Sequence, residues 1–123
     1  MAANSHSSLA LIVSSPPYQN RVARADIDIA LAAAALDFEL QVYFSGHSIF
    51  QLAADRKTTG AMLPAGYRAW ASLPDLAEVK IYAEQRWMDF CTSNRLELVM
   101  PVEALSPARM KQAWRNCRHV LVL

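Results

Sequence analysis

The sequence predicts a single α/β domain built on a five-stranded, mostly parallel sheet with helices on both faces. Apolar runs of strand length alternate along the chain with segments of helical pattern, which is typical of a parallel sheet. The first run is continuously apolar rather than alternating, as expected of a strand covered on both faces. The length of 123 residues fits one domain. We expect a flexible N-terminus at residues 1–7 and the domain at residues 8–123.

The first three elements come from the N-terminal third of the chain. Residues 9–13 are apolar and form the first strand, which a Ser-Ser-Pro-Pro segment ends. Residues 26–36 predict a helix, since alanine is the best helix former and Asp26 and Asp28 suit the positive end of a helix dipole. This helix is apolar nearly all round, so we expect it to be buried. Residues 38–44 read as the second strand, with three β-prone residues at its end.

The middle of the chain predicts two short helices and a third strand. A Ser-Gly pair breaks the second strand, and a short helix is expected at residues 48–54. A second helical segment at residues 67–73 ends at Pro74, because proline is not tolerated in a helix interior. Residues 78–83 contain β-prone valine, isoleucine and tyrosine and predict the third strand.

The last third predicts two further helices and two strands. Residues 84–94 suit a helix with one apolar side, and residues 96–100 read as the fourth strand. Ser106 is placed to cap the next helix, with a proline at its first position, and this helix runs to about residue 116. Residues 119–123 predict a terminal strand.

Composition favours an oligomer and excludes several classes of protein. Apolar residues make up 54% of the chain and charged residues only 19%, so a domain of this size must expose apolar surface, which often marks an interface. The net charge of +1 gives no general attraction to nucleic acid or to an anionic membrane. No apolar run is long enough for a membrane span or an export signal, so we expect a cytoplasmic protein.

Any site should lie in the loops that follow the strands, because open parallel sheets bind ligands beyond the carboxyl ends of their strands. The first such loop has no glycine and two consecutive prolines, which argues against a phosphate cradle and against a flavin or nucleotide cofactor. His47 in the second loop is a candidate acid–base group, although a plain loop histidine is the simpler interpretation. Glu84 and Glu103 are a candidate carboxylate pair, with a helix-start charge and a solvated side chain as the alternatives.

Two cysteines need to be weighed as reactive thiols, and they have neither disulfide-framework nor zinc spacing. Cys91 is the better candidate, but it lies about two turns into its expected helix, beyond the useful reach of the dipole. Its neighbours Trp87 and Phe90 favour a buried core thiol instead. Cys117 has Arg115 and Arg118 beside it, which would lower its pKa, yet it sits at the negative end of a helix.

The C-terminal helix carries a basic stretch formed by Arg109, Lys111, Arg115 and Arg118. These residues do not make one clean stripe, since only the last three can share a helix face. A solvated helix face explains them, and an RNA contact is the alternative. We therefore expect no strong direct binding to nucleic acid.

Three stretches resemble one family. Residues 24–36 match its first helix, with an acidic start and an alanine-rich body; residues 42–52 match its strand, turn and helix; and residues 119–123 match its terminal strand. The most recognisable piece is Phe50-Gln51-Leu52. Together with length and element order, these stretches resemble the TusC/DsrF branch of the DsrE/DsrF-like sulfur-relay family over nearly the whole chain.

The resemblance implies a five-stranded α/β fold and assembly with two homologous small subunits, as in TusBCD- or DsrEFH-like complexes, which pass persulfide sulfur between cysteines. It further implies an indirect link to a sulfur-carrier protein. From the glycine-free first loop we expect no cofactor. We expect Phe50, Gln51 and Leu52 to contribute to a subunit interface. The Tus complex serves 2-thiouridine formation at the tRNA wobble position, and the Dsr complex serves dissimilatory sulfur oxidation.

The chain departs from the family at the site that would handle sulfur. In the catalytic relatives the relay cysteine ends the third strand, and the matching position here is Tyr82, which cannot form a persulfide. Gly46-His47 replaces the Asp-Gly common in the second turn. We therefore predict a non-catalytic subunit of a sulfur-relay complex that supports 2-thiouridine synthesis at the tRNA wobble position. The alternatives are a subunit of a dissimilatory sulfur-oxidation complex, a stand-alone thiol sulfurtransferase that uses Cys91, and a ligand-binding module of flavodoxin-like form.

Overall fold

The computed structural model describes residues 8–14, 20–36, 38–52, 70–73, 75, 79–98 and 100–123, with backbone only at residues 20–25. The expected flexible segment at residues 1–7, the prolines of the first loop and the first part of the helix expected at residues 67–73 lie outside this part. The elements in chain order are β1 (Ser8–Val13), α1 (Asn20–Ala35), β2 (Glu39–Phe44), the 3-10 helix η2 (Gly46–Leu52), β3 (Val79–Glu84), α3 (Gln85–Ser93), β4 (Glu103–Leu105), α4 (Pro107–Arg115) and β5 (His119–Val122).

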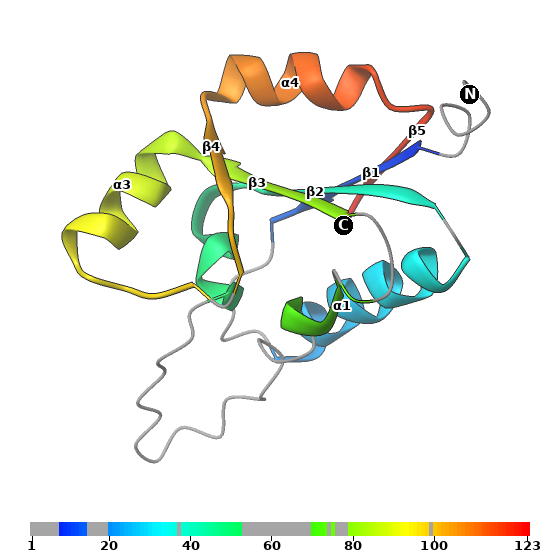
Figure 1. The fold of residues 1–123 in the computed structure, drawn as a ribbon, viewed down its shortest axis with the longest axis horizontal. Helices are drawn as coiled ribbons and strands as arrows, with labels where there is room; N and C mark the ends of the chain where they lie inside the picture. The colour runs from blue at the N-terminus through cyan, green and yellow to red at the C-terminus, as the bar shows by residue number, and fades with distance from the viewer. Residues whose placement is uncertain are drawn as a thin grey trace.

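The five strands form one sheet in the order β4-β3-β2-β1-β5. Every pair in it is parallel, and Leu11 of β1 is aligned with Val42 of β2 and with Leu121 of β5. The predicted α/β class with a mostly parallel sheet is therefore confirmed. Figure 1 shows α4 on one face of the sheet and α1 on the opposite face.

The central strands are buried on both sides, because successive side chains of a strand point to opposite faces. On β1, Leu11 and Val13 enter the main core together with buried residues of α1. Ala10 and Ile12 face the other way and join a smaller cluster beneath α4. This double coverage explains why β1 is continuously apolar, as the sequence indicated.

Helix α1 starts earlier than predicted, at Asn20 rather than near Asp26. Its buried residues Ile27, Ala30, Ala33 and Ala34 are spaced three or four apart and enter the main core, as one face of a helix requires. Ile29 and Leu36 are exposed on the outer side. Over residues 26–35 the helix is therefore buried on one face and exposed on the other, so the expected burial holds for one face of this part.

The predicted fourth strand at residues 96–100 was wrong. The strand that pairs with β3 is β4, in which Glu103 aligns with Tyr82 and Leu105 with Glu84. Among the described residues of the earlier segment, which are 96–98 and 100, Leu98 alone makes an isolated β-bridge. Leu96, Leu98 and Met100 pack on the main core instead. Their apolar spacing therefore reflects burial of an irregular segment, which local pattern does not distinguish from a strand.

The end of the chain matches its prediction. The Ser106 hydroxyl accepts a hydrogen bond from the backbone N–H of Arg109 over 3.2 Å, with Pro107 at the start of α4, as a helix N-cap requires. Helix α4 ends at Arg115, and β5 follows at His119–Val122. β5 returns to the sheet beside β1, at the edge opposite β4.

Candidate functional site

The carboxyl ends of β2 and β3 are tied together by one side chain. A single carboxylate oxygen of Glu84, the last residue of β3, accepts hydrogen bonds from the Gly46 N–H over 2.8 Å and from the Ser45 hydroxyl over 3.1 Å. Gly46 has a φ of +58°, a left-handed conformation that glycine adopts without a Cβ penalty. Glu84 therefore holds the turn between β2 and η2, at the edge of the sheet where ligands of parallel sheets bind.

The hydroxyl groups at this edge are also used to hold the strands. The Ser48 hydroxyl is buried and lies 2.8 Å from the carbonyl oxygens of both Val13 and Ser45. The Ser14 hydroxyl donates to the carbonyl of Leu123 over 3.2 Å, which joins β1 to the end of β5. The hydroxyl groups of Ser14 and Ser48 donate hydrogen bonds to backbone carbonyls and so connect neighbouring segments of the protein.

Tyr82, the residue that the sequence resemblance matches to the relay cysteine, lies beneath α4 rather than at the edge of the sheet. Its ring stacks on the buried ring of Tyr43 with centres 4.9 Å apart and planes 16° apart. Tyr43 in turn meets Trp114 of α4 edge-on at 5.6 Å. β3 continues two residues past Tyr82 to Glu84, so the phenol occupies a packed position within the sheet.

Cys91 lies inside the main core on α3, and only 2% of its surface is exposed. Burial raises the pKa of its thiol, because a low dielectric disfavours the charged thiolate. Nothing in this environment resembles the cationic, accessible surroundings of reactive cysteines. Phe90, its neighbour on the helix, is exposed instead, so the two side chains do not share the apolar side that the sequence suggested.

Cys117 is half-buried at the other end of the sheet, between α4 and β5. Burial raises the pKa of its thiol, the nearby Glu39 carboxylate raises it further, and a hydrogen bond with Ser8 opposes both effects. The pKa of Cys117 is therefore raised overall, and not lowered as expected from Arg115 and Arg118. Since Ser8 and Glu39 begin their strands, this thiol lies far along the sheet from the carboxyl ends.

Four rings gather where η2 meets α3, and we call them the rim aromatic surface. They are His47, Phe50, Trp87 and Phe90. The ring centres of His47 and Trp87 are 4.3 Å apart, and Phe50 lies 5.8 Å from Phe90 and 6.0 Å from Trp87. The guanidinium of Arg86 stands 5.2 Å over the Trp87 ring. His47 and Phe90 are exposed, so the cluster reaches the exterior of the protein.

Sequence reasoning missed this surface because its residues come from segments about forty positions apart. His47 was weighed as a single acid–base residue, yet its contacts are with the rings of Trp87 and Phe50. No local sequence pattern links His47 to the residues of α3. The only signal was the high apolar content, which predicted exposed apolar area without placing it.

The interface expected at Phe50, Gln51 and Leu52 needs correction. Leu52 is fully buried, and Gln51 is 3% exposed, with its side-chain oxygen accepting a 3.1 Å hydrogen bond from the indole N–H of Trp70. These two side chains hold the protein together from inside and offer no surface to a partner. Phe50 alone is half-buried and reaches the rim aromatic surface.

The structure does not bring Glu84 and Glu103 together as a catalytic pair. Glu103 is aligned with Tyr82 and begins β4, whereas Glu84 ends β3 opposite Leu105. The oxygen of Glu84 that carries the contacts is already used by Ser45 and Gly46. Glu84 therefore has a structural role in holding the turn, and the register puts Glu103 two positions away from it along the ladder.

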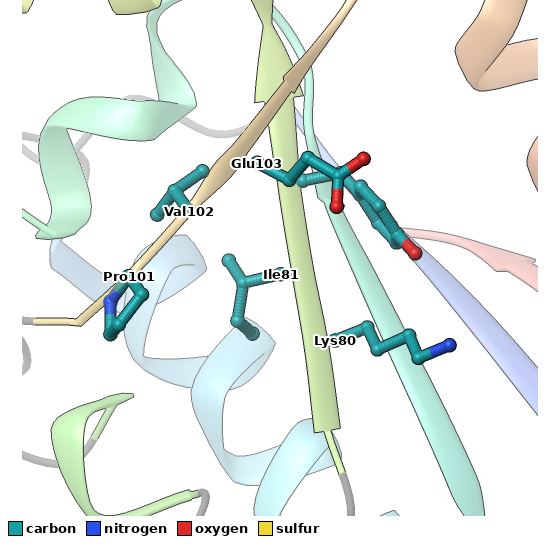
Figure 2. Close-up of a pocket in the computed structure, with 6 residues that line it drawn as sticks. Lys80, Ile81, Pro101, Val102 and Glu103 are labelled. Atoms are coloured by element: carbon teal, nitrogen blue, oxygen red, sulfur yellow. The ribbon is translucent and has the colours of Figure 1, made fainter.

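A shallow hollow of about 300 Å³ lies between β3 and the segment that leads into β4. Figure 2 shows Lys80 and Glu103 directed to one side of it, with Ile81, Pro101 and Val102 on the other. It sits beside the first half of β3, away from the carboxyl ends of the strands. It therefore does not coincide with the position at which parallel sheets bind their ligands.

Among the described residues there is neither a metal-binding cluster nor a helix that could cross a membrane. Within residues 8–14, 20–36, 38–52 and the described parts beyond, no group of three or more His, Cys, Asp or Glu side chains could hold a metal ion. Over the same ranges, no helix combines the length and the apolar character needed to cross a membrane.

Comparisons with known proteins identify relatives over most of the chain. A family model described as the DsrE/DsrF-like family matches residues 7–123. The chain is 32% identical over 109 residues to Protein TusC of Klebsiella pneumoniae strain 342, covering 84% of this chain and 87% of that protein. It is 29% identical, with the same coverage, to Protein TusC of a second K. pneumoniae strain.

A solved structure supports the fold independently. The crystal structure of the ychN protein from E. coli superposes with a TM-score of 0.70, covering 94% of this chain and 98% of that chain. At 13% identity, this similarity concerns the fold alone. It agrees with the single domain and the five-stranded parallel sheet described above.

Proposed function

This chain belongs to the DsrE/DsrF-like family, and we propose that it is the TusC-like, non-catalytic subunit of a heteromeric sulfur-relay complex. In this role the chain positions its partners and does not itself carry sulfur. The partners are homologous small subunits of the same fold, and a sulfur-carrier protein is reached through them. The cytoplasmic location expected from the sequence remains part of this proposal.

The observation that carries the proposal is the packing of Tyr82. Tyr82, which the resemblance matches to the relay cysteine, is a phenol stacked on Tyr43, and a phenol has no thiol with which to form a persulfide. Burial raises the pKa of both thiols, Cys91 and Cys117, so neither has the stabilised thiolate that sulfur transfer needs. The alternative of a stand-alone sulfurtransferase that uses Cys91 would need an exposed thiol, and this one is buried in the core.

The rim aromatic surface supports a role through contact. Aromatic residues are enriched at protein interfaces because they bury a large area at a small entropic cost. Phe90 is 45% exposed, and Arg86 lies over the neighbouring Trp87 ring. A partner that covered this surface would remove apolar area from water and keep the Arg86–Trp87 contact. We place one subunit interface here, with Phe50 as its half-buried member.

We further propose that the complex serves formation of 2-thiouridine at the tRNA wobble position. The support for this step is that both curated relatives are named Protein TusC. The chain is not proposed to bind tRNA itself, since its net charge of +1 gives no general attraction to a polyanion.

Co-expression with the two related small subunits tests the assembly. We expect the three chains to elute together and at a constant ratio in size-exclusion chromatography with light scattering. A matched co-expression with an unrelated domain of similar size controls for non-specific association. The proposal fails if this chain elutes apart from both subunits.

A mass measurement tests the non-catalytic role separately. The purified complex is incubated with a persulfide donor, and the mass of each intact chain is recorded. We expect added sulfur on a partner chain and none on this one. Added sulfur on this chain that disappears in Cys91→Ser would instead support the stand-alone thiol enzyme.

A further inference from the structure

The outer edge of β5 is apolar and exposed. Val120, Leu121 and Val122 are 44%, 43% and 70% exposed, and among the strands that the structure describes β5 pairs with β1 and ends the sheet. Exposed edge strands in natural proteins are normally guarded by charges, prolines or short length. β5 (His119–Val122) contains neither an acidic residue nor lysine nor proline. The opposite edge strand, β4, is three residues long, begins with Glu103 and follows Pro101, whereas the four residues of β5 have short length as their guard and no charge or proline.

The backbone of β5 also has unused hydrogen-bonding groups in a defined pattern. The Leu123 N–H donates to the Ile12 carbonyl over 2.9 Å, and Ile12 is aligned with Val122. In a parallel ladder, alternate residues of a strand bond to the same neighbour. Leu121 and Leu123 therefore bond toward β1, so the N–H and carbonyl groups of Val120 and Val122 point outward from the sheet.

This pattern is self-complementary. In an antiparallel pair, two directly opposite residues either exchange both backbone hydrogen bonds or exchange none, in alternation. If two copies of β5 run antiparallel with Leu121 opposite its counterpart, Val120 of each copy faces Val122 of the other. Both facing pairs then exchange hydrogen bonds, and the two Leu121 side chains meet at the closer, non-hydrogen-bonded position.

The side chains and charges fit the same arrangement. The sequence Val120-Leu121-Val122 reads identically in both directions, so the three facing pairs formed by residues 120–122 are aliphatic. Arg115 and Arg118 lie before β5, and antiparallel pairing puts these cations at opposite ends of the joined strands, where they do not repel each other. A parallel arrangement of two copies would bring them side by side and would not form a closed dimer.

We propose that β5 pairs with β5 of a second copy of this chain, in antiparallel register centred on Leu121, to form one continuous sheet across two protomers. The proposal does not depend on the sulfur-relay assignment. It gives an isologous contact, in which the same patch serves both subunits. Within a heteromeric complex, this contact would join two assemblies that each contain one copy of the chain.

A charge exchange at Leu121 tests the two-fold axis itself, because only there does a residue face its own counterpart. In the proposed dimer, Leu121→Lys puts two lysines opposite each other and Leu121→Glu puts two glutamates opposite each other. We expect each variant alone to be monomeric by analytical ultracentrifugation, while an equimolar mixture regains the dimer. Failure of the mixture to re-associate would overturn the proposed register.

A proline variant tests the backbone pairing without changing the inner ladder. Val120→Pro removes an outward N–H, whereas the bonds of Leu121 toward β1 stay in place. We expect the variant to keep the circular dichroism spectrum of the wild type and to lose the dimer. As a matched control, Phe90→Lys changes a side chain of similar exposure on the rim aromatic surface, and it should remain dimeric.

Three results would overturn the proposal. The first is a wild-type chain that stays monomeric at every concentration tested, both alone and in its complex. The second is a dimer that Phe90→Lys dissociates and Val120→Pro does not, since the contact would then lie at the rim aromatic surface. The third is pairing of β5 with a related small subunit only, detected as protection of β5 amides in the heteromeric complex and not in the isolated chain.

Discussion

The carboxylate of Glu84 lies 2.8 Å from the backbone nitrogen of Gly46, so the end of β3 holds the turn that follows β2. This contact fixes the base of η2, and η2 contacts both β3 and α3. The rim aromatic surface is built from η2 and α3, so its shape depends on a hydrogen bond made by a residue outside it. The carboxylate of Glu84 at the edge of the sheet therefore helps to fix the position of the rim aromatic surface.

Replacing Glu84 by alanine should lower the free energy of unfolding by roughly 1–3 kcal/mol, because a charged acceptor is lost and the Gly46 N–H is left without its partner. Urea unfolding followed by circular dichroism measures the change. Glu103→Ala removes an exposed carboxylate from the neighbouring strand and should stay within about 0.5 kcal/mol of the wild type. Equal losses in both variants would show that the Glu84 contact contributes nothing specific.

Much of the fold could be predicted from the sequence because its signals are local. The apolar run of β1, the β-prone end of β2 and the Ser106 cap each depend on neighbouring residues and all appear in the structure. The position of β4 depends on pairing with β3, which is set by contacts distant in sequence. The apolar segment at residues 96–100 was therefore mistaken for the strand that follows it.

The candidate site could be predicted only in part, for the same reason. Residue order suggested which residue of β3 corresponds to the relay cysteine, whereas the stacking of Tyr82 on Tyr43 depends on the register of β2 and β3. Burial of Gln51 and Leu52 likewise depends on tertiary contacts, since Gln51 bonds to Trp70 and Leu52 lies in the main core. Sequence order gives the identity of such residues, and tertiary packing decides whether they face a partner or the core.

The cap of α4 gives a second stability prediction. Ser106→Ala removes the acceptor of the Arg109 N–H and should cost about 1 kcal/mol, the usual loss for an N-cap serine. Thermal unfolding is the appropriate measurement, with the change evaluated at the midpoint of the wild type. Ser93→Ala, at the exposed last position of α3, serves as the matched control and should change little. An unchanged midpoint in Ser106→Ala would mean that packing alone holds the start of the helix.

Substitution on the rim aromatic surface should weaken partner binding without unfolding the chain. Phe90→Asp puts a charge at a ring that is 45% exposed, and we expect affinity for the related subunits to fall at least tenfold, or by about 1.4 kcal/mol. Isothermal titration calorimetry with the purified subunits would show the loss. Leu36→Asp, at an even more exposed apolar residue after α1, is the control and should bind as the wild type does. Loss of binding in the control alone would move the interface to α1.

Cys91 provides a prediction on pH and reactivity. Burial holds the folded-state pKa of this thiol above its ordinary value of about 8.5, so on raising the pH the unfolded chain loses the proton first. Above that value the unfolded state binds fewer protons than the folded state, and the free energy of unfolding therefore falls as pH rises. Cys117 and Tyr43 have raised pKa values as well, so their contributions have the same sign. Cys91→Ala should make this alkaline decline shallower, as urea titrations at a series of pH values would show.

The same burial should protect Cys91 from modification. In a Cys117→Ser background, which leaves Cys91 as the remaining thiol, a maleimide should label the native chain roughly a hundredfold more slowly than the urea-unfolded chain. That factor corresponds to an opening free energy of about 2.8 kcal/mol. The rate should also rise as urea is added below the unfolding midpoint, because labelling requires the core around α3 to open. Rapid labelling in native buffer would contradict the buried position and would restore Cys91 as a candidate sulfur acceptor.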